Sequence, residues 1–177
     1  MNFNIISTSI KADKFDKQAS DILCGKIGGV CYMANSFNNL LNEDLQKTIK
    51  RIDRTMGSGH HSVFEHIYIT INLENIPKLF AMVLNNEKTF VTSEKSARYT
   101  KMVMTEKEEA LYNKWMAIFE KKIRQRYPNK EGFMTDQKVT KLAQENARYL
   151  ISVKTPTTMI HTISYRQLNY LCKWLQD

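Results

Sequence analysis

Alternating apolar and polar positions mark the clearest strand of the chain, at residues 67–73. The apolar residues Ile67, Ile69, Ile71 and Leu73 alternate there with Tyr68, Thr70, Asn72 and Glu74. A period of two is typical of a strand with one face buried. Weaker alternation predicts a first strand over residues 3–10, and the segment after Pro156 predicts another strand over residues 157–164.

Helical spacing of apolar residues predicts most of the remaining elements. We expect helices over residues 13–23, 43–56, 78–85, 105–127, 135–150 and 166–177. Thr105 and Glu108 form a capping box, and Pro77 lies at the helix start that proline prefers. In the helix over 43–56, the apolar residues at helical spacing are Leu45, Ile49, Ile52 and Met56. The helix over 105–127 is predicted to turn Leu111, Trp115, Ile118, Phe119 and Ile123 toward the core, and the next helix Val139, Leu142, Ala143, Ala147 and Leu150. The glycines at 25, 28 and 29 are predicted to break the chain.

Long helices outnumber strands, and the strands do not alternate regularly with helices. This order favours an α+β fold over a parallel α/β sheet. The length of 177 residues predicts a single domain, residues 1–177, with a substantial core.

Composition narrows the class of protein. The chain is 42% hydrophobic and 25% charged, which is typical of a globular protein. No apolar run approaches the roughly 20 residues of a membrane-spanning helix, and the N-terminus does not resemble a signal peptide. Three cysteines without CxxC spacing favour a cytoplasmic protein. We expect Cys31 and Cys172 to be inert core residues.

The formal net charge of +8 favours anionic partners such as nucleotides, phosphates or nucleic acid. Much of it lies in two runs, Lys47-Lys50-Arg51-Arg54 and Lys121-Lys122-Arg124-Arg126-Lys130. Both runs fall on predicted helices, where a solvated helix face is the simpler interpretation. Charge alone does not separate a nucleotide enzyme from a nucleic-acid-binding protein.

Histidine and carboxylate residues cluster at His60, His61, Glu65 and His66. In an α-helix, His61 and Glu65 would share one face, as zinc ligands do. The segment is not H-E-x-x-H, however, and no further residues complete four ligands, so we expect no metal site. A polar pair that closes a short helix is the alternative for Glu65 and His66.

A second polar cluster occupies alternate positions, at Thr92, Glu94, Ser96 and Arg98. In an extended chain all four side chains point to one side. A carboxylate, hydroxyls and a guanidinium together suit a small anionic ligand such as a nucleotide monophosphate. A surface loop with an ion pair between Glu94 and Arg98 is the alternative.

Several boxes in chain order resemble the flavin-dependent thymidylate synthases. They are Cys31-Tyr32, Gly59-His60-His61-Ser62-Val63-Phe64-Glu65-His66, the strand at 67–73, Ser93-Glu94-Lys95-Ser96-Ala97-Arg98-Tyr99, Glu145-Asn146-Ala147-Arg148 and Arg166-Gln167-Leu168. The resemblance implies an α+β fold with a small, antiparallel-rich sheet packed with several long helices. It also implies a cytoplasmic homotetramer that acts on dUMP or a related pyrimidine nucleotide.

The resemblance also implies a chemistry and a set of site residues. FAD would be the cofactor, with methylenetetrahydrofolate and NADPH as co-substrates, in the conversion of dUMP to dTMP. The implied cofactor-binding residues are Ser62, Glu65, Lys88, Ser93 and Arg166. The implied catalytic residues are Glu94, Ser96 and Arg98, which also bind substrate together with Arg148.

The chain departs from the family pattern in one box. Asn86-Glu87-Lys88 stands where the family has R-H-R, and Val91 and Ser93 replace the motif serine and asparagine. We also expect the family's C-terminal helical segment to be absent, since the sequence ends at Asp177. These differences keep two alternatives open: an enzyme of the same fold that modifies another pyrimidine nucleotide, and a non-catalytic protein that binds nucleotides or nucleic acid.

Overall fold

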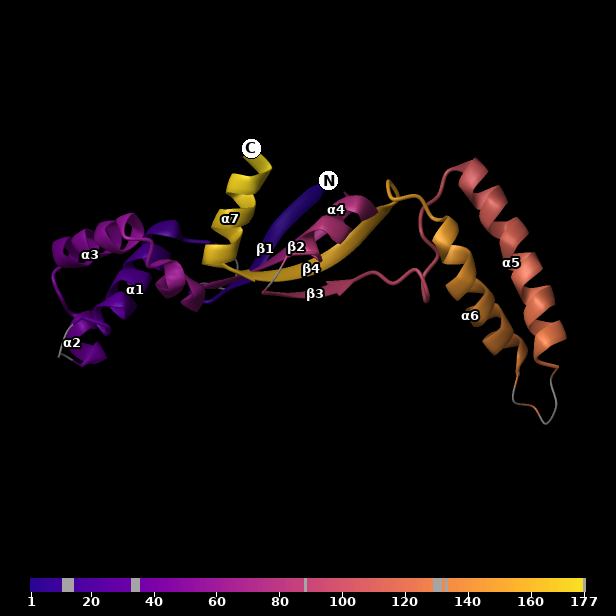
Figure 1. The fold of residues 1–177 in the computed structure, drawn as a ribbon, viewed down its shortest axis with the longest axis horizontal. Helices are drawn as coiled ribbons and strands as arrows, with labels where there is room; N and C mark the ends of the chain where they lie inside the picture. Colours follow the sequence, from indigo (N-terminus) through magenta and orange to yellow (C-terminus); the bar gives the residue numbers. More distant parts are fainter. Residues whose placement is uncertain (11–14, 33–35, 88, 129–131, 133, 177) are drawn as a thin grey trace. The chain divides into compact units, whose positions relative to one another are not determined.

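The computed structural model describes residues 1–10, 15–32, 36–87, 89–128, 132 and 134–176. Its strands are β1 (Asn2–Thr8), β2 (Tyr68–Pro77), β3 (Phe90–Glu94) and β4 (Pro156–Ser164). Its α-helices are α1 (Lys17–Gly29), α2 (Phe37–Leu41), α3 (Leu45–Gly57), α4 (Lys78–Leu84), α5 (Glu106–Arg126), α6 (Asp136–Ala147) and α7 (Tyr165–Gln176). Two 3-10 helices, η1 (His61–His66) and η2 (Arg148–Leu150), complete the described elements (Figure 1).

The strands form a four-stranded sheet in the order β1-β2-β4-β3. A small sheet with several long helices is the predicted α+β class. In the described part of the chain, no helix combines the length and the apolar character needed to span a membrane.

The chain contacts divide into two compact units. The first unit comprises Met1–Asn2, Leu73–Asn86 and Ser93–Met159. The second unit comprises Phe3–Asn72, Glu87–Thr92 and Ile160–Asp177.

In the second unit, helix α1 packs closely against helix α3 (Figure 1). A Cβ atom on Gly25 would lie 2.5 Å from Cγ1 of Ile52, and one on Gly29 would lie 2.9 Å from a guanidinium nitrogen of Arg51. The prediction that these glycines break the chain is therefore wrong. Helix α1 continues through them because the absent side chains make room for α3.

The start of helix α1 also differs from the prediction. Asp16 caps the helix, since its side chain accepts a hydrogen bond from the backbone N–H of Ala19 at 2.9 Å. The predicted start at residue 13 lies outside the described residues. Helix α3 begins as its cap dictates, with Asp44 accepting hydrogen bonds from the backbone N–H groups of Gln46 and Lys47.

The apolar stripe of helix α3 is not the buried face that its spacing predicts. Leu45, Ile49 and Met56 are 44%, 37% and 44% exposed, whereas Thr48 and Thr55 are buried. The helix instead turns its threonine side toward α1, where the glycines allow close approach. The apolar core of this unit gathers around Cys24, Phe64 and Ile67.

Cysteine placement corrects a further expectation. Cys31 and Cys172 are exposed, and only Cys24 among the three is buried. Burial raises the pKa of the Cys24 thiol to about 12, so this thiol is the inert core residue that the sequence led us to expect elsewhere.

In the first unit, α5 and α6 lie side by side (Figure 1). The predicted capping box is confirmed, because the Thr105 and Glu108 side chains each bond to the other's backbone. Ile123, Val139 and Ala143 form the buried cluster between the two helices. Leu111, predicted to face inward, is 43% exposed, and its neighbour Tyr112 is buried instead.

Candidate functional site

Residues His61–His66 form the 3-10 helix η1 between α3 and β2. A 3-10 helix has about three residues per turn, so side chains three positions apart eclipse each other. Ser62 and Glu65 therefore share one face, whereas His61 aligns with Phe64. The α-helical alignment of His61 with Glu65 does not occur, and no cluster of metal-ligating side chains exists among the described residues.

Arg166, at the start of helix α7, pairs with Glu65. Its Nη1 lies 3.5 Å from Oε1 of Glu65, and both side chains are about one-third exposed. The Nε of Arg166 donates to the Tyr170 hydroxyl at 3.3 Å, and this hydrogen bond raises the pKa of the guanidinium. Arg166 thus stays a cation at any working pH, held over η1 and open to solvent.

Tyr170 links Arg166 to His61. The Tyr170 hydroxyl lies 3.1 Å from Nδ1 of His61, while Nε2 of His61 lies 3.3 Å from the Met56 carbonyl oxygen. One ring nitrogen can donate to that carbonyl, which leaves the other to accept from the tyrosine. The α7–η1 junction is therefore a chain of polar contacts, with an ion pair from Glu65 to Arg166 and hydrogen bonds from Arg166 to Tyr170 and from Tyr170 to His61.

A cavity of about 370 Å³ opens on the His61 side of η1. It is lined by Lys17, Asp21, Ile52, Asp53, Met56, His61, Phe64, Tyr165, Arg166, Asn169 and Tyr170. The Tyr165 hydroxyl donates to Oδ1 of Asp21 at 3.0 Å, and Lys17 pairs with Oδ2 of Asp21 at 2.5 Å. Burial and the Asp21 charge raise the pKa of Tyr165, so its phenol remains protonated and acts as a donor.

A second cavity, of about 400 Å³, lies along helix α3 and the turn that follows it. Its lining residues are Tyr32, Lys50, Arg51, Arg54, Thr55, Ser58 and His60. We call it the α3 cavity. It accounts for most of the first basic run, for which the sequence favoured a solvated helix face.

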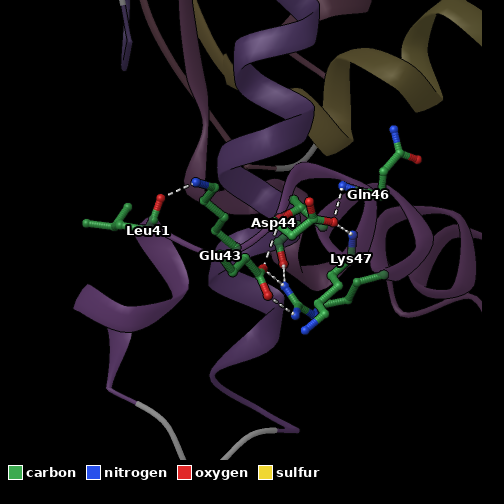
Figure 2. Close-up of polar contacts among 9 residues, drawn as sticks. Leu41, Glu43, Asp44, Gln46 and Lys47 are labelled. Atoms are coloured by element: carbon green, nitrogen blue, oxygen red, sulfur yellow. Dashed lines mark hydrogen bonds and ion pairs between the residues drawn. The ribbon is translucent and has the colours of Figure 1, made fainter.

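Arg51 is the fixed member of that basic run. Its Nη1 and Nη2 bond to the two Glu43 oxygens at 2.5 and 2.8 Å, and Nη1 also donates to the Gly25 carbonyl at 2.9 Å. The Arg51 hydrogen bonds lower the pKa of Glu43. Glu43 lies beside the helix cap Asp44 at the entrance to α3 (Figure 2).

In the first unit, Glu94 lies at the end of strand β3. It forms an ion pair with Lys78, accepts from the Thr157 hydroxyl at 3.3 Å, and accepts from the Asn85 amide at 3.3 Å. The alternative ion pair between Glu94 and Arg98 is wrong. The Glu94 carboxylate is instead oriented by three side chains from β4, α4 and the end of α4.

The alternation predicted from Thr92 to Arg98 ends at Glu94. Thr92 and Glu94 share a strand face, but residues 97–99 form a turn in which the Arg98 backbone N–H donates to the Ser96 hydroxyl at 3.2 Å. The exposed Arg98 guanidinium lies 5.6 Å from the centre of the Tyr99 ring. Ser96 and Arg98 are therefore close to each other, but they do not continue the face of Glu94.

The remaining expected residues stand apart from these groups. Arg148 donates to the Glu145 carbonyl at 3.1 Å and lies 5.2 Å from the Tyr149 ring centre. Ser93 is exposed on β3. Lys88 lies outside the described residues, and Glu87 is half-buried. The structure thus brings Ser62, Glu65 and Arg166 together in the second unit, and it carries Glu94, Ser96, Arg98 and Arg148 in the first.

Two hydrogen bonds between side chains were not predicted from the sequence. The Tyr165–Asp21 bond joins residues 144 positions apart, and the His61–Tyr170 bond joins residues 109 apart. Helical periodicity contains no information on contacts of this length. Only the position of Tyr165 beside Arg166 in a recognised box hinted that this segment faces a site.

The order of the boxes along the chain matches a known family over nearly its whole length. The family model described as "Thymidylate synthase complementing protein" matches residues 15–175. This chain belongs to that family. The resemblance found in the sequence is therefore confirmed, while the role of each site residue remains a prediction.

A curated relative and solved structures agree with this membership. The flavin-dependent thymidylate synthase of Pyrococcus furiosus is 23% identical over 151 residues, which are 78% of this chain. The chain spans 57% of the length of that relative.

Two solved structures share the fold of this thymidylate synthase complementing family member. The UMP/dUMP methylase PolB from Streptomyces cacaoi, bound with 5-Br dUMP, superposes with a TM-score of 0.58 at 19% identity over 94% of this chain and 74% of PolB. Thymidylate synthase X from Helicobacter pylori, with FAD and dUMP, superposes with a TM-score of 0.57 at 16% identity over 97% of this chain and 82% of that one. The α+β prediction is confirmed.

Proposed function

We propose that this chain is a flavin-dependent methylase of a uridine nucleotide, converting dUMP to dTMP with FAD as cofactor. Methylenetetrahydrofolate would supply the carbon and NADPH the reducing equivalents. One observation carries the proposal: residues 15–175 match the family, and within them Arg166 pairs with Glu65, which shares a face of η1 with Ser62.

The donors and acceptors around η1 fit a flavin. Ser62 offers an exposed hydroxyl, Glu65 a carboxylate and Arg166 a guanidinium, so the edge of a polar ring meets both donors and acceptors. The Tyr170 hydrogen bond fixes the direction of the Arg166 side chain before a ligand arrives. A bound flavin would supply hydride transfer, and the residues of the chain would bind and orient it.

The first unit would hold the nucleotide. Lys78, Asn85 and Thr157 fix the Glu94 carboxylate as an acceptor for a ring N–H or a ribose hydroxyl. The exposed guanidinium of Arg98 is suited to bidentate contact with a phosphate. Ser96 would act beside Arg98, and Arg148 would be a further cation for the phosphate.

A related nucleotide is the second candidate substrate. It is favoured by the fold shared with a UMP/dUMP methylase and by the Asn86-Glu87-Lys88 box, which replaces two basic family residues. UMP differs from dUMP in the 2′-hydroxyl, which demands a hydrogen-bond partner when buried. Substrate choice then depends on whether such a partner faces the ribose.

We propose a single domain that works as a cytoplasmic homotetramer. Exposed apolar side chains on the last helix, Trp174 and Leu175, are each 55% exposed and would be buried between subunits. Those on α3 are Leu45, Ile49 and Met56. Light scattering of the purified chain measures the assembly directly, and a monomer at micromolar concentration would contradict this part of the proposal.

The test is product formation by the full chain. The protein is incubated with FAD, NADPH and methylenetetrahydrofolate and either dUMP or UMP, and the nucleotide is analysed by mass spectrometry. We expect a 5-methyl product from at least one of them. Flavin binding without a methylated product from either would leave a nucleotide-binding flavoprotein and refute the methylase.

A matched pair of variants tests the nucleotide site. Arg98→Ala should reduce dUMP affinity by about a hundredfold, since it removes a charge-assisted bidentate contact. Arg126→Ala removes an exposed arginine at the end of α5 and serves as the control. Equal dUMP affinity in the two variants, measured by isothermal titration calorimetry, would remove Arg98 from the site.

A further inference from the structure

The α3 cavity combines cations, hydroxyls and an aromatic ring without an acidic side chain. Lys50 and Arg54 contribute charge, Thr55, Ser58 and Tyr32 contribute hydroxyls, and none of the seven lining residues is a carboxylate. By contrast, the cavity that includes His61 and Arg166 is lined by both Asp21 and Asp53. The α3 cavity therefore selects for an anion, whereas its neighbour is electrostatically mixed.

Two of its cations have no ion-pair partner among the residues that the structure describes. Arg51 is occupied by Glu43 and by the Gly25 carbonyl. Lys50 and Arg54, in contrast, form no ion pair or side-chain hydrogen bond with any described residue, and both are exposed. Together with Lys47 they lie three, four and seven positions apart on α3. Like charges at these spacings repel each other along a helix, and a bound anion would relieve that repulsion.

The C-terminal end of helix α3 repels an anion less strongly than a helix end with free carbonyl groups would. Three of its last four carbonyl oxygens accept hydrogen bonds: that of Arg54 from the backbone N–H of Ser58, that of Met56 from Gly59, and that of Thr55 from His60. Gly59 makes this turn with a φ of +77°, a conformation that favours glycine. The turn places the His60 ring on the cavity, two residues before Ser62.

We infer that the α3 cavity binds the diphosphate of a dinucleotide cofactor, with Lys50 and Arg54 as its charged contacts. A diphosphate carries several acceptor oxygens, which match the cations and hydroxyls of the lining. Tyr32, 64% exposed at the rim, offers a face on which a base can stack. The inference rests on the proposed function, because it assigns the diphosphate of the FAD whose ring contacts Ser62, Glu65 and Arg166.

A solvated helix face is the simpler interpretation of this basic run, and the exposed Lys50 and Arg54 agree with it. The α3 cavity adds that these two exposed cations line a hollow. A solvated face needs no concave lining and no aromatic rim. The α3 cavity has both, and its lining residue Arg51 is held in place by its ion pair with Glu43. The described residues of the second basic run, Lys121, Lys122, Arg124 and Arg126, line neither of the two cavities described above.

The experiment measures ligand affinity of the full chain by calorimetry, with FAD, riboflavin and ADP as probes. The double variant Lys50→Gln/Arg54→Gln is compared with the wild type. Lys121→Gln/Lys122→Gln is the control, because it removes the same charge from exposed positions on α5. We expect the first variant to bind FAD and ADP at least about tenfold more weakly, with riboflavin affinity unchanged. The control should match the wild type.

The outcomes separate the inference from the proposed function. If FAD binds the wild type and the Lys50/Arg54 variant equally, the inference fails while the flavoprotein stands. If the wild type binds ADP in a manner that depends on Lys50 and Arg54 but binds neither flavin, the flavoprotein fails while the diphosphate site stands. Binding of a single-stranded oligonucleotide but of no mononucleotide or dinucleotide would overturn both.

Discussion

The ion pair between Arg51 and Glu43 should contribute unusually strongly to stability. Their side chains are only 13% and 9% exposed, and the two-pronged contact is supplemented by bonds from Arg51 to Gly25 and from Thr48 to Glu43 at 2.9 Å. Arg51→Met would leave a nearly buried carboxylate without its cation. Removing one member of a buried pair costs about 3 to 5 kcal/mol. We expect a loss of about 3 kcal/mol in the free energy of unfolding at pH 7, near the lower end, since some solvent reaches both groups.

The matched control is Arg124→Met. Arg124 also pairs with a carboxylate, that of Asp136 at 2.6 Å, but these side chains are 50% and 87% exposed. Exposed pairs contribute about 1 kcal/mol or less. Urea unfolding followed by circular dichroism gives both values under one set of conditions. Equal losses in the two variants would refute the argument that burial makes the Glu43–Arg51 pair strong.

The same pair predicts a dependence on pH. Arg51 holds the pKa of Glu43 below its ordinary value. A carboxyl with a lowered folded-state pKa contributes stability above its unfolded pKa of about 4.3, and that contribution is lost as pH falls through the folded value. The difference between wild type and Arg51→Met should therefore shrink below pH 4. A difference that stays constant from pH 7 to pH 3 would contradict this account of Glu43.

Three further substitutions test the packing. Gly25→Ala should lower the free energy of unfolding by about 1 to 3 kcal/mol, because the added Cβ would lie 2.5 Å from Ile52. Gly57→Ala, which has open space around it, should leave the free energy of unfolding unchanged. Equal effects would contradict close packing of α1 on α3. Burial lowers the pKa of His161, whose Nδ1 has no partner among the described residues. The stability of the wild type should therefore fall as the pH drops below about 6.5, and His161→Leu should abolish that fall. An unchanged pH profile of stability in the variant would rule out His161 as the source. Thr105→Ala should lower the thermal midpoint through a cap loss of about 1 kcal/mol, and no shift would mean that the capping box is dispensable.

Local rules succeeded where an element is determined by its own residues. The α5 capping box, the helix start after Pro77 and the buried face of α6 all follow from spacings of three or four residues. β4 likewise lies within one residue of its predicted start. In each case propensity and hydrophobic pattern point to the same structure.

Sequence reasoning failed where a distant segment determines the local structure. Helix α1 passes through its glycines because α3 packs on them, and nothing within residues 17–29 reveals that partner. The sequence did not predict strand β3, Phe90–Glu94, because it has only five residues and forms by pairing with the distant strand β4. The Glu65–Arg166 contact was implied only by the family resemblance, since residues 101 positions apart share no local pattern.

The central claim is that this chain binds flavin at η1, and the absorbance spectrum of the purified protein tests it most directly. FAD is added in modest excess, unbound cofactor is removed by gel filtration, and NADPH is then added under anaerobic conditions. We predict retained bands of oxidised flavin that bleach with NADPH, and weaker retention in Arg166→Ala. A colourless protein after gel filtration would contradict the account.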